Sequence, residues 1–371
     1  MSTTRGLEGI VATTSSVSSI IESVLTYQGY DIDDLADNAS FEEVIYLLWN
    51  GRLPKEQELR SFTEELAGHA EIPQAIIEQM KSYPINEVHP MAALRTAISS
   101  LALFDENADV MENDANRLKA LKIQAQIPTI VTAFSRVREG KEPVAPRKDL
   151  GFAANFLYML NGEEPDEVAV NAFNKALVLH ADHELNASTF TARVCVATLS
   201  DVYSGITAAI GALKGPLHGG ANEAVMSMLM DIDEVENVEP YIRKALDNKE
   251  KIMGFGHRVY KNGDPRAKHL REMSKQLTTI TGESKWYEMS LKVEDMVTGE
   301  KGLLPNVDFY SASVYHSLGI KHDLFTPIFA VSRASGWLAH ILEQYSDNRL
   351  IRPRAEYVGP GKQTFIPIGQ R

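Results

Sequence analysis

Two histidines and one aspartate lie beside glycine, proline or asparagine, where a bound molecule can come close to the backbone. They are His218 in Gly-Pro-Leu-His-Gly-Gly-Ala-Asn-Glu at 215–223, His257 in Gly-Phe-Gly-His-Arg at 254–258, and Asp308 in Pro-Asn-Val-Asp-Phe at 305–309. An aspartate can remove a proton from carbon when a hydrogen-bond donor stabilises the developing anion, and an imidazole can be that donor. A second imidazole can polarise a ketone. The set therefore fits carbon–carbon bond formation between an enolisable acyl group and a ketone, with a metal site or purely structural histidines as alternatives.

Several arginines have the chemistry to hold an anionic ligand. They are Arg266 after Asp-Pro, Arg333 within an apolar stretch, and Arg352 and Arg354 on either side of a proline. The guanidinium group is a planar fork that pairs with a carboxylate through two hydrogen bonds. As a group the arginines indicate a di- or tricarboxylate ligand. For Arg333 alone, a side chain that reaches the surface along its stem or pairs with a buried acid is an equal alternative.

The run His-Ala-Asp-His-Glu at 180–184 permits a different interpretation. On a helix, His180 and His183 are three residues apart and could share a metal ion. The sequence offers no evident third ligand at a distance. Metal binding is therefore the less favoured hypothesis.

Helical patterns dominate the elements that must position these groups. Apolar spacing, with Pro, Gly, Asp or Asn at the ends, predicts helices at about 41–50, 55–69, 73–82, 90–104, 111–138, 151–160 and 166–180. Ser40 and Glu43 form a capping-box pattern at the start of the first of these. A short strand or hairpin is predicted within 6–19, and an extended arm at 349–358.

Two further stretches concern the core. The small residues of 187–213 predict one long helix that is the buried centre of the larger domain. Thr326 and Pro327 predict the N-cap and the first residue of a later apolar helix. The chain becomes more charged after His218, which predicts a small domain at 219–313 inserted into a large domain of 1–218 and 314–371. The predicted fold class is all-α.

Composition narrows the class of protein. The chain has 371 residues and a net charge of −13, which argues against general binding to nucleic acid. Cys195 is the single cysteine, so neither an intramolecular disulfide nor a cysteine-rich zinc site can form. The sequence shows no signal-peptide core and no apolar run that could span a bilayer, and a cytoplasmic location is the resulting prediction.

The motifs together resemble the citrate synthase family. To the three motifs that hold His218, His257 and Asp308, the resemblance adds Asp-Pro-Arg at 264–266, Val-Ser-Arg at 331–333 and Arg-Pro-Arg at 352–354. It runs from Gly6 to the C-terminal arm, and the form resembled is the short dimeric type of bacteria and archaea. The resemblance implies an almost all-helical homodimer in which a small mobile domain closes over the substrates. The implied enzyme is an acyltransferase that turns acetyl-CoA, oxaloacetate and water into citrate and CoA.

The resemblance also implies roles for single residues. His218 would hydrogen-bond the thioester oxygen of acetyl-CoA while Asp308 removes a methyl proton, and His257 would polarise the ketone of oxaloacetate. The oxaloacetate-binding positions are matched by His183, Arg266, Arg333, Arg352 and Arg354. Arg352 matches an arginine that reaches the site from the partner subunit, so that each active site is completed across the dimer interface.

The implied coenzyme contacts are looser. They fall on Ile252, Gly254, Gly256, Arg258, Lys261, Lys301 and Asn306. Acetyl-CoA and CoA enter as cosubstrate and product, with no tightly bound cofactor and no metal. Two rival functions stay open: 2-methylcitrate synthase, which would use propionyl-CoA, and a non-catalytic sensor of CoA or tricarboxylates. One methylene is worth only about 1–3 kcal/mol in an apolar pocket, so the motifs do not separate the two enzymes.

Overall fold

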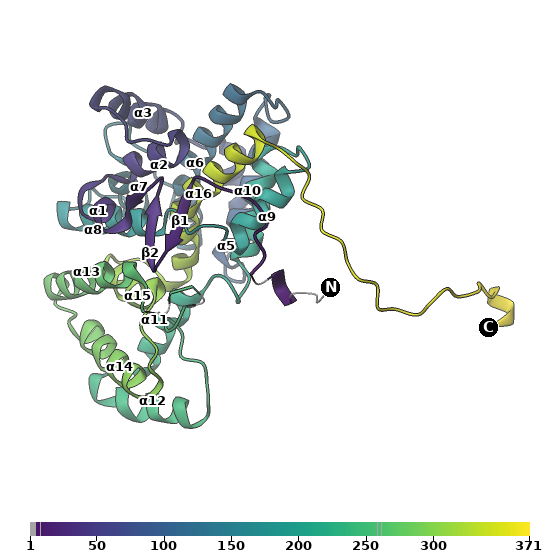
Figure 1. The fold of residues 1–371 in the computed structure, drawn as a ribbon. Helices are drawn as coiled ribbons and strands as arrows, with labels where there is room; N and C mark the ends of the chain where they lie inside the picture. The colour runs from purple at the N-terminus through teal and green to yellow at the C-terminus, as the bar shows by residue number, and fades with distance from the viewer. Residues whose placement is uncertain (1–4, 8, 258, 261) are drawn as a thin grey trace.

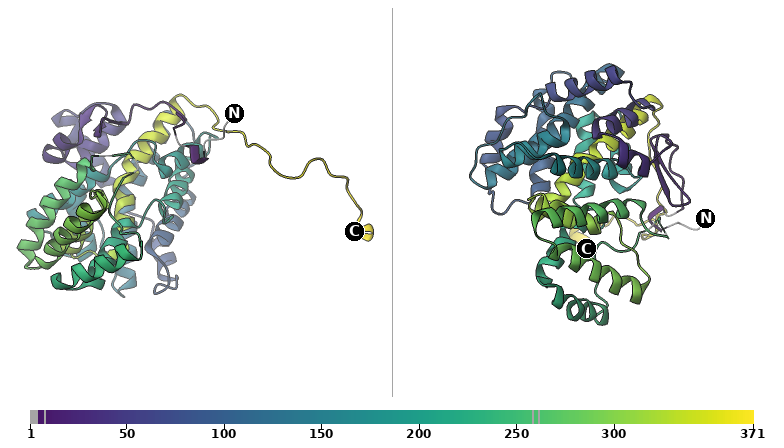
Figure 2. Two further views of the ribbon diagram at one scale, coloured as in Figure 1. Left: turned by 60° about the horizontal axis from the view of Figure 1, so that its bottom comes forward. Right: turned by 90° about the vertical axis from the view of Figure 1, so that its left-hand side faces the viewer.

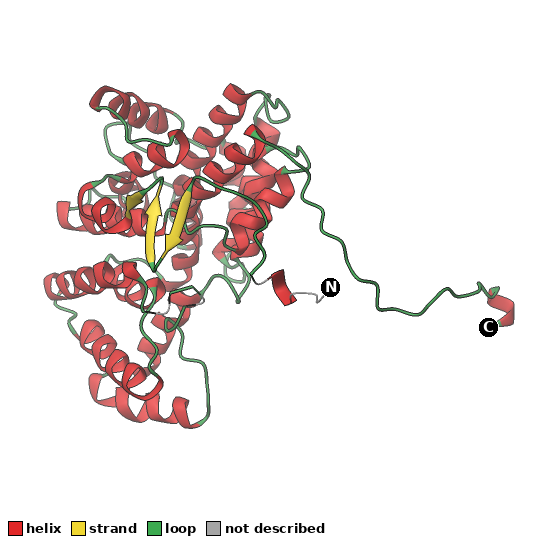
Figure 3. Cartoon of the chain, viewed as in Figure 1, coloured by secondary structure: helices red, strands yellow, loops and turns green. Residues whose placement is uncertain are grey.

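The computed structural model describes residues 5–7, 9–257, 259–260 and 262–371, which form sixteen α-helices and one small sheet (Figure 1, Figure 3). The strands are β1 (Ser18–Ile21), β2 (Val24–Tyr27) and β3 (Tyr30–Asp31), antiparallel and in that order. The first ten helices are α1 (Ile32–Asn38), α2 (Phe41–Asn50), α3 (Glu56–Gly68), α4 (Gln74–Lys81), α5 (Pro90–Leu101), α6 (Asn113–Arg138), α7 (Phe152–Asn161), α8 (Glu167–His180), α9 (Ala187–Val196) and α10 (Val202–Leu213). The remaining six are α11 (Ala221–Ile232), α12 (Val238–Asp247), α13 (Pro265–Thr281), α14 (Lys285–Lys301), α15 (Val307–Ser317) and α16 (Phe325–Ser346). The prediction of an almost all-helical chain is confirmed.

Helix α16 lies at the centre of the larger group of helices. It packs against α2, α6, α8, α9 and α10, and most of its side chains are buried, including Trp337. A helix that is surrounded on all sides needs apolar residues all round its circumference. Arg333 and His340 are the exceptions that matter for function, because both are buried charged or polar groups within this core.

The single long helix predicted over 187–213 is wrong. The chain forms two helices, α9 and α10, that pack against each other. Leu199 adopts a left-handed φ of 65° between them, and the Asp201 carboxylate accepts a hydrogen bond from the Ser204 N–H at 3.0 Å. An aspartate that caps a new helix competes with continuation of the old one. Helix α16, not this stretch, forms the centre.

Two other predictions of position are also wrong. The strand expected within 6–19 begins only at Ser18, because the hairpin turn lies at Glu22 and Ser23, which adopt the positive φ values of 50° and 70° that a tight hairpin needs. Helix α16 begins at Phe325, one residue before the expected cap. Thr326 therefore lies inside the first turn, with its hydroxyl buried.

Most helix ends lie within a few residues of the prediction. The capping box at α2 is present, since the Glu43 N–H donates to Ser40 Oγ at 3.2 Å and the Ser40 N–H donates to Glu43 Oε2 at 2.8 Å. The predicted arm at 349–358 has no regular structure and is exposed. It leads the C-terminus far from the body of the molecule (Figure 1, Figure 2).

Helices α11 to α15 form a second, smaller group below the rest in Figure 1. Within it, α11 and α13 pack on α15, and α12 packs on α14. In the part of the chain that the structure describes, we find no helix with the length and apolarity needed to cross a membrane.

Candidate active site

The loop that carries His257 is fastened to the segment that carries Asp308. The Asn306 N–H donates to the Gly254 carbonyl at 2.9 Å, and the Asn306 side-chain amide donates to the Gly256 carbonyl at 2.9 Å. The side-chain oxygen of Asn306 accepts a hydrogen bond from the Asp308 N–H at 3.0 Å and so caps α15. The histidine and the aspartate, far apart in the chain, are thus held by one asparagine.

Gly254 is required for this packing. Its φ of 82° lies in the left-handed region that favours glycine. A Cβ at this position would lie 2.8 Å from Val225 Cγ2 and 2.9 Å from a ring carbon of Phe309. The loop can therefore lie directly on α11 and α15 only because residue 254 has no side chain.

The His257 ring is oriented by its own backbone. Its Nδ1 accepts hydrogen bonds from the Val259 N–H at 3.0 Å and the Tyr260 N–H at 3.2 Å. The neutral ring must then carry its proton on Nε2. Burial, together with the charge of Arg266, lowers the pKa of His257. The ring is consequently a neutral hydrogen-bond donor through Nε2.

His183 lies next to His257, in the loop between α8 and α9. The two ring centroids are 5.1 Å apart, and His183 Nε2 is 3.0 Å from the Tyr260 hydroxyl. Burial keeps the pKa of His183 well below its usual value, and the charges of Arg266 and Arg333 add to the effect. A neutral imidazole therefore lies beside two buried cations.

His218 is oriented from the other side by Ser188, at the start of α9. His218 Nε2 is 2.7 Å from Ser188 Oγ and accepts from the Ser188 N–H at 3.3 Å. Ser188 Oγ also donates to Asn186 Oδ1 at 2.8 Å and accepts from Trp337 Nε1–H at 3.0 Å, which holds the hydroxyl in place. Because the backbone N–H of Ser188 donates to Nε2, the ring proton of neutral His218 is on Nδ1. Burial and the charge of Arg333 lower the pKa of His218 to about 4.

Asp308 has the protonation behaviour of a general base. Burial raises its pKa to about 6, against the opposing charges of Arg266 and Arg333. A carboxylate with a pKa near neutrality is ionised at pH 7 and still basic enough to accept a proton from a weak acid. The charge of Arg333 also lowers the pKa values of His218 and His183.

Arg266 is anchored by Asp264 at the start of α13. Arg266 Nε donates to Asp264 Oδ1 at 2.8 Å and Nη2 donates to Asp264 Oδ2 at 2.7 Å. The same carboxylate accepts from the Val307 N–H at 3.0 Å. Because both partners are buried, this two-pronged pair fixes Arg266 beside the helix that carries Asp308.

Arg333 is 2% exposed, and its guanidinium group has no direct ion pair among the described residues. Its Nε donates to the His180 carbonyl at 2.8 Å, and its guanidinium carbon lies 4.6 Å from the ring centroid of Phe329. Among the residues that the structure describes, we find no carboxylate within ion-pair distance of it. Burial lowers its pKa to about 10. A buried cation of this kind calls for an anionic partner.

His180 and His183 do not lie three residues apart on one helix, as the metal hypothesis required. Helix α8 ends at His180, so His183 lies in the following loop. His180 Nδ1 is 2.7 Å from the Ala176 carbonyl, and its ring packs against Phe329 inside the core. Across the described ranges, no group of three or more His, Cys, Asp or Glu residues is placed to hold a metal ion. His180 therefore serves the core, while His183 faces the site.

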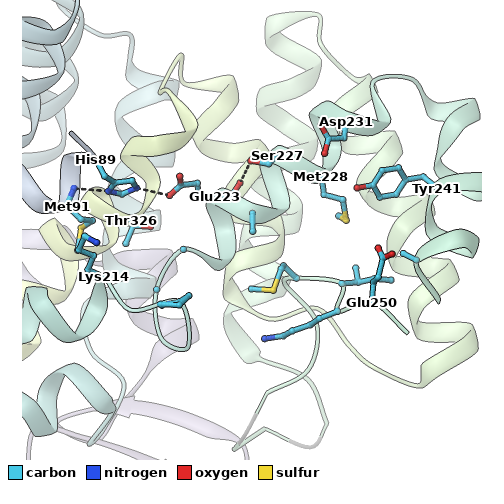
Figure 4. Close-up of a pocket in the computed structure, with 18 residues that line it drawn as sticks. His89, Met91, Lys214, Glu223, Ser227, Met228, Asp231, Tyr241, Glu250 and Thr326 are labelled. Carbon is cyan, nitrogen blue, oxygen red and sulfur yellow. Dashed lines mark hydrogen bonds and ion pairs between the residues drawn. The ribbon is translucent and has the colours of Figure 1, made fainter. Parts of the chain in front are cut away.

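A cavity of about 590 Å³ opens beside both histidine loops (Figure 4). Its wall includes Gly219, which follows His218, and Ile252, which precedes the His257 loop. Figure 4 shows His89, Lys214 and Thr326 on one side of it, and Met228, Asp231 and Tyr241 on the other. Its size suits a small-molecule ligand or part of a larger one.

The described part of the structure does not bring every predicted residue to this site. Arg258 and Lys261 are outside the described residues. Lys301 is exposed in the last turn of α14. Arg352 and Arg354 are exposed on the arm, which extends away from the body of its own chain (Figure 1). The chain does not bring these two arginines to its own site.

Three residues of the site were not identified from the sequence. Asp264 precedes a proline, a pattern typical of a helix start, and this signal could have indicated its position beside Arg266. Ser188 lies in the first turn of α9, two residues after the N-cap Asn186, which is a comparable signal. The hydroxyl of Tyr260 gives no comparable signal in the sequence.

The fold and the site together define an enzyme that condenses an acyl thioester with a keto acid. Residues 6–354 match the family model described as citrate synthase, C-terminal domain. The chain belongs to the citrate synthase family, and it is an acyltransferase-type enzyme that condenses acetyl-CoA with oxaloacetate.

Individual relatives agree over almost the whole chain. The chain is 73% identical over 371 residues to citrate synthase 2 of Bacillus subtilis (strain 168), which covers 100% of both proteins. It matches a citrate synthase from Thermoplasma acidophilum, solved in a ternary complex with carboxymethyl coenzyme A and oxaloacetate, at 37% identity and a TM-score of 0.93. The match covers 99% of this chain and 98% of that one. 

The 2-methylcitrate synthase 1 of Corynebacterium glutamicum is 43% identical, covering 99% of this chain and 98% of that protein. The greater likeness to the Bacillus citrate synthase favours citrate synthase over 2-methylcitrate synthase.

Proposed function

We propose that Asp308, His218 and His257 carry out the condensation in this enzyme. Asp308 removes a proton from the methyl group of acetyl-CoA, while the Nδ1–H of His218 hydrogen-bonds the thioester oxygen, so that an enol forms. The Nε2–H of His257 polarises the ketone of oxaloacetate, and the enol carbon attacks it. Water then cleaves the thioester of citryl-CoA and releases citrate and CoA. The tautomers derived above give each imidazole the donor that its step needs.

The observation that carries this proposal is Arg333, a buried cation whose charge acts on the pKa values of Asp308, His218 and His183. Oxaloacetate has two carboxylates, and a guanidinium fork can pair with one of them. Arg266 and His183 complete the oxaloacetate site from the small and the large group of helices. A carboxylate of the ligand would supply the direct ion pair that Arg333 does not form with any described residue.

The coenzyme occupies the cavity in Figure 4, with its thioester toward His218. Ile252 lines this cavity. Gly254 and Gly256 belong to the His257 loop that follows it, and Asn306 is hydrogen-bonded to that loop. Lys214 and Lys251 also line this cavity and would supply cations for the phosphates of the coenzyme. Lys261, Arg258 and Lys301 stay predictions as coenzyme contacts. No cofactor is held permanently in this scheme, because CoA leaves with each turnover.

Release of free thiol tests the function and the acyl preference together. On mixing with oxaloacetate, acetyl-CoA should give a kcat/KM at least about tenfold above that of propionyl-CoA, the value of one methylene in an apolar pocket. Reversal of that ratio would assign the protein to the 2-methylcitrate synthases. Absence of thiol with either substrate would leave a sensor of CoA or tricarboxylates.

The functional unit in this proposal is a homodimer whose arms are exchanged. The arm leaves its own body and exposes apolar side chains along its length, among them Tyr357 at 77% and Phe365 at 79%. Side chains of this kind are normally covered by a partner. Wrapping round a second copy would cover them and carry Arg352 and Arg354 to the partner's active site.

Arg352→Ala should raise the KM for oxaloacetate by about tenfold or more, because it removes a charge-assisted hydrogen bond. Steady-state kinetics with varied oxaloacetate measure the effect. Lys362→Ala, which removes another exposed cation of the arm, is the matched control and should leave KM within about twofold.

Mixed dimers show which subunit the arm serves. In a dimer of one Asp308→Ala and one Arg352→Ala subunit, exchange of arms leaves one site with both residues intact, and about half of the wild-type activity should return. The rates are compared at oxaloacetate concentrations well below KM, where the loss of Arg352 has its full effect. An arginine acting on its own subunit would leave no intact site and only about one twentieth of the wild-type rate.

The division into domains belongs to the same proposal. Residues 219–313 form the part that closes over the substrates, and residues 1–218 and 314–371 form the larger part. Helix α15 runs past residue 313 and therefore joins the two. The cytoplasmic location stays a prediction from the sequence.

A further inference from the structure

One short connection carries two groups of the site. The residues between α8 and α9 include His183, and the first turn of α9 adds Ser188, which orients His218. Asp182 precedes His183 and points the opposite way, into the core, where it is fully buried. A buried carboxylate is costly unless hydrogen bonds compensate for the loss of water.

The Asp182 carboxylate is bound from two other elements. Its Oδ2 accepts a hydrogen bond from Ser18 Oγ on β1 and lies 3.2 Å from His340 Nε2 on α16. Ser18 Oγ in turn accepts from the Glu184 N–H at 2.8 Å, so that one serine holds both sides of His183. The connection is therefore fastened to the sheet and to the central helix.

The His340 ring is fixed by a buried arginine. Arg193 Nη1 donates to His340 Nδ1 at 3.1 Å, and Arg193 Nε donates to Gln344 Oε1 at 3.0 Å. Since Nδ1 is an acceptor, the proton of the ring is on Nε2 and points to Asp182. Arg193 also pairs with Glu343. The result is a hydrogen-bonded chain from α9 through α16 to Asp182.

The backbone of Asp182 is held as well. The Tyr27 hydroxyl donates to the Asp182 carbonyl at 3.1 Å and accepts from the Asp182 N–H at 3.2 Å. The Gly336 N–H donates to the Ala181 carbonyl at 3.2 Å. A Cβ on Gly336 would lie 2.2 Å from Asp182 Oδ1, so α16 approaches this residue as closely as a glycine permits.

We propose that Asp182 is a positioning residue: bound by Ser18, Tyr27 and His340, it fixes the connection that presents His183 to oxaloacetate and Ser188 to His218. Asp182 touches neither substrate in this scheme and acts through these two neighbours. The inference rests on the roles proposed above for His183 and His218.

Asp182→Ala tests this role. Loss of both carboxylate bonds should weaken oxaloacetate binding about tenfold and lower kcat about tenfold, since small displacements of site groups have effects of that size or larger. Asp182→Asn is the rescue variant, because an amide oxygen at the Oδ2 position can still accept from Ser18 and His340; both constants should return to within about threefold of wild type. Calorimetric titration with oxaloacetate measures binding without turnover.

Glu42→Ala is the matched control. Glu42 is a buried carboxylate that accepts from the Phe152 N–H at 2.7 Å, away from every residue of the site. Its loss should lower the unfolding temperature as Asp182→Ala does, while oxaloacetate binding and kcat stay within about twofold. Equal losses of binding in both variants would mean general destabilisation and would overturn the proposal.

Tyr27→Phe is the alternative test if Asp182→Ala does not fold. It removes only the hydroxyl that is hydrogen-bonded to the backbone of Asp182. It should weaken oxaloacetate binding at least about threefold, and wild-type binding would overturn the proposal. His183→Ala and His218→Ala are measured alongside. Wild-type turnover in these two would refute the proposed site itself, whereas their loss beside a normal Asp182→Ala would refute only the positioning role.

Discussion

Asp308→Asn is expected to lower kcat at least about a hundredfold while oxaloacetate still binds, because general bases contribute at least that factor. The amide keeps the shape of the carboxylate and its place in the first turn of α15, but it cannot accept the methyl proton. Thiol release measures kcat, and calorimetry measures oxaloacetate binding. Turnover within about tenfold of wild type would contradict the role of base.

The pH dependence provides an independent test of the same residue. Asp308 is active only when ionised, and its pKa is raised to about 6. We expect kcat/KM for acetyl-CoA to fall below that pH and to be level above it. The pKa of His218 is lowered to about 4, so this ring stays neutral through the window, and burial also lowers the pKa of His257. An acid limb far from pH 6 would assign the titration to another group.

The raised pKa also has a consequence for stability. A carboxyl whose pKa is higher in the folded than in the unfolded protein stabilises the fold at low pH, and this contribution is lost as pH rises from about 4 to 6. At pH 8 the ionised Asp308 therefore destabilises the fold. Asp308→Asn should increase the free energy of unfolding there by about 1–3 kcal/mol, with little difference at pH 4. Denaturant titrations at the two pH values measure it.

His218→Ala should have an effect of similar size on kcat, at least about a hundredfold, because the enol loses the donor at its oxygen. Ser188→Ala removes the hydroxyl that lies 2.7 Å from His218 Nε2 and helps to orient the ring. Its kcat should fall by about tenfold, the usual scale for a group that orients another. We expect kcat to be lowest in His218→Ala, intermediate in Ser188→Ala and highest in the wild type.

His316→Ala is the control for this series. His316 is also half-buried but lies at the end of α15, where it faces Glu283 and Trp286. Its kcat should stay within about twofold of wild type. Near-normal turnover in His218→Ala, with normal acetyl-CoA binding, would remove His218 from the mechanism.

Local patterns in the sequence were sufficient for most helices and for naming the candidate catalytic residues. The capping box of Ser40 and Glu43 and the glycines around His257 act within a few residues, so their effects can be predicted without a partner. The same local reasoning failed at 197–201, where the cap at Asp201 starts a new helix and the apolar pattern alone suggested continuity.

The sequence by itself determined the helical class and named the two histidines, the aspartate and the arginines as candidate site residues, because residue type and short-range spacing carry that information. Only the tertiary structure decided how these groups are held. Asn306 joins the His257 and Asp308 segments, Ser188 sets the proton of His218, and burial sets the pKa of Asp308. These effects depend on distances between residues far apart in the chain and on exclusion of water, which no local pattern contains.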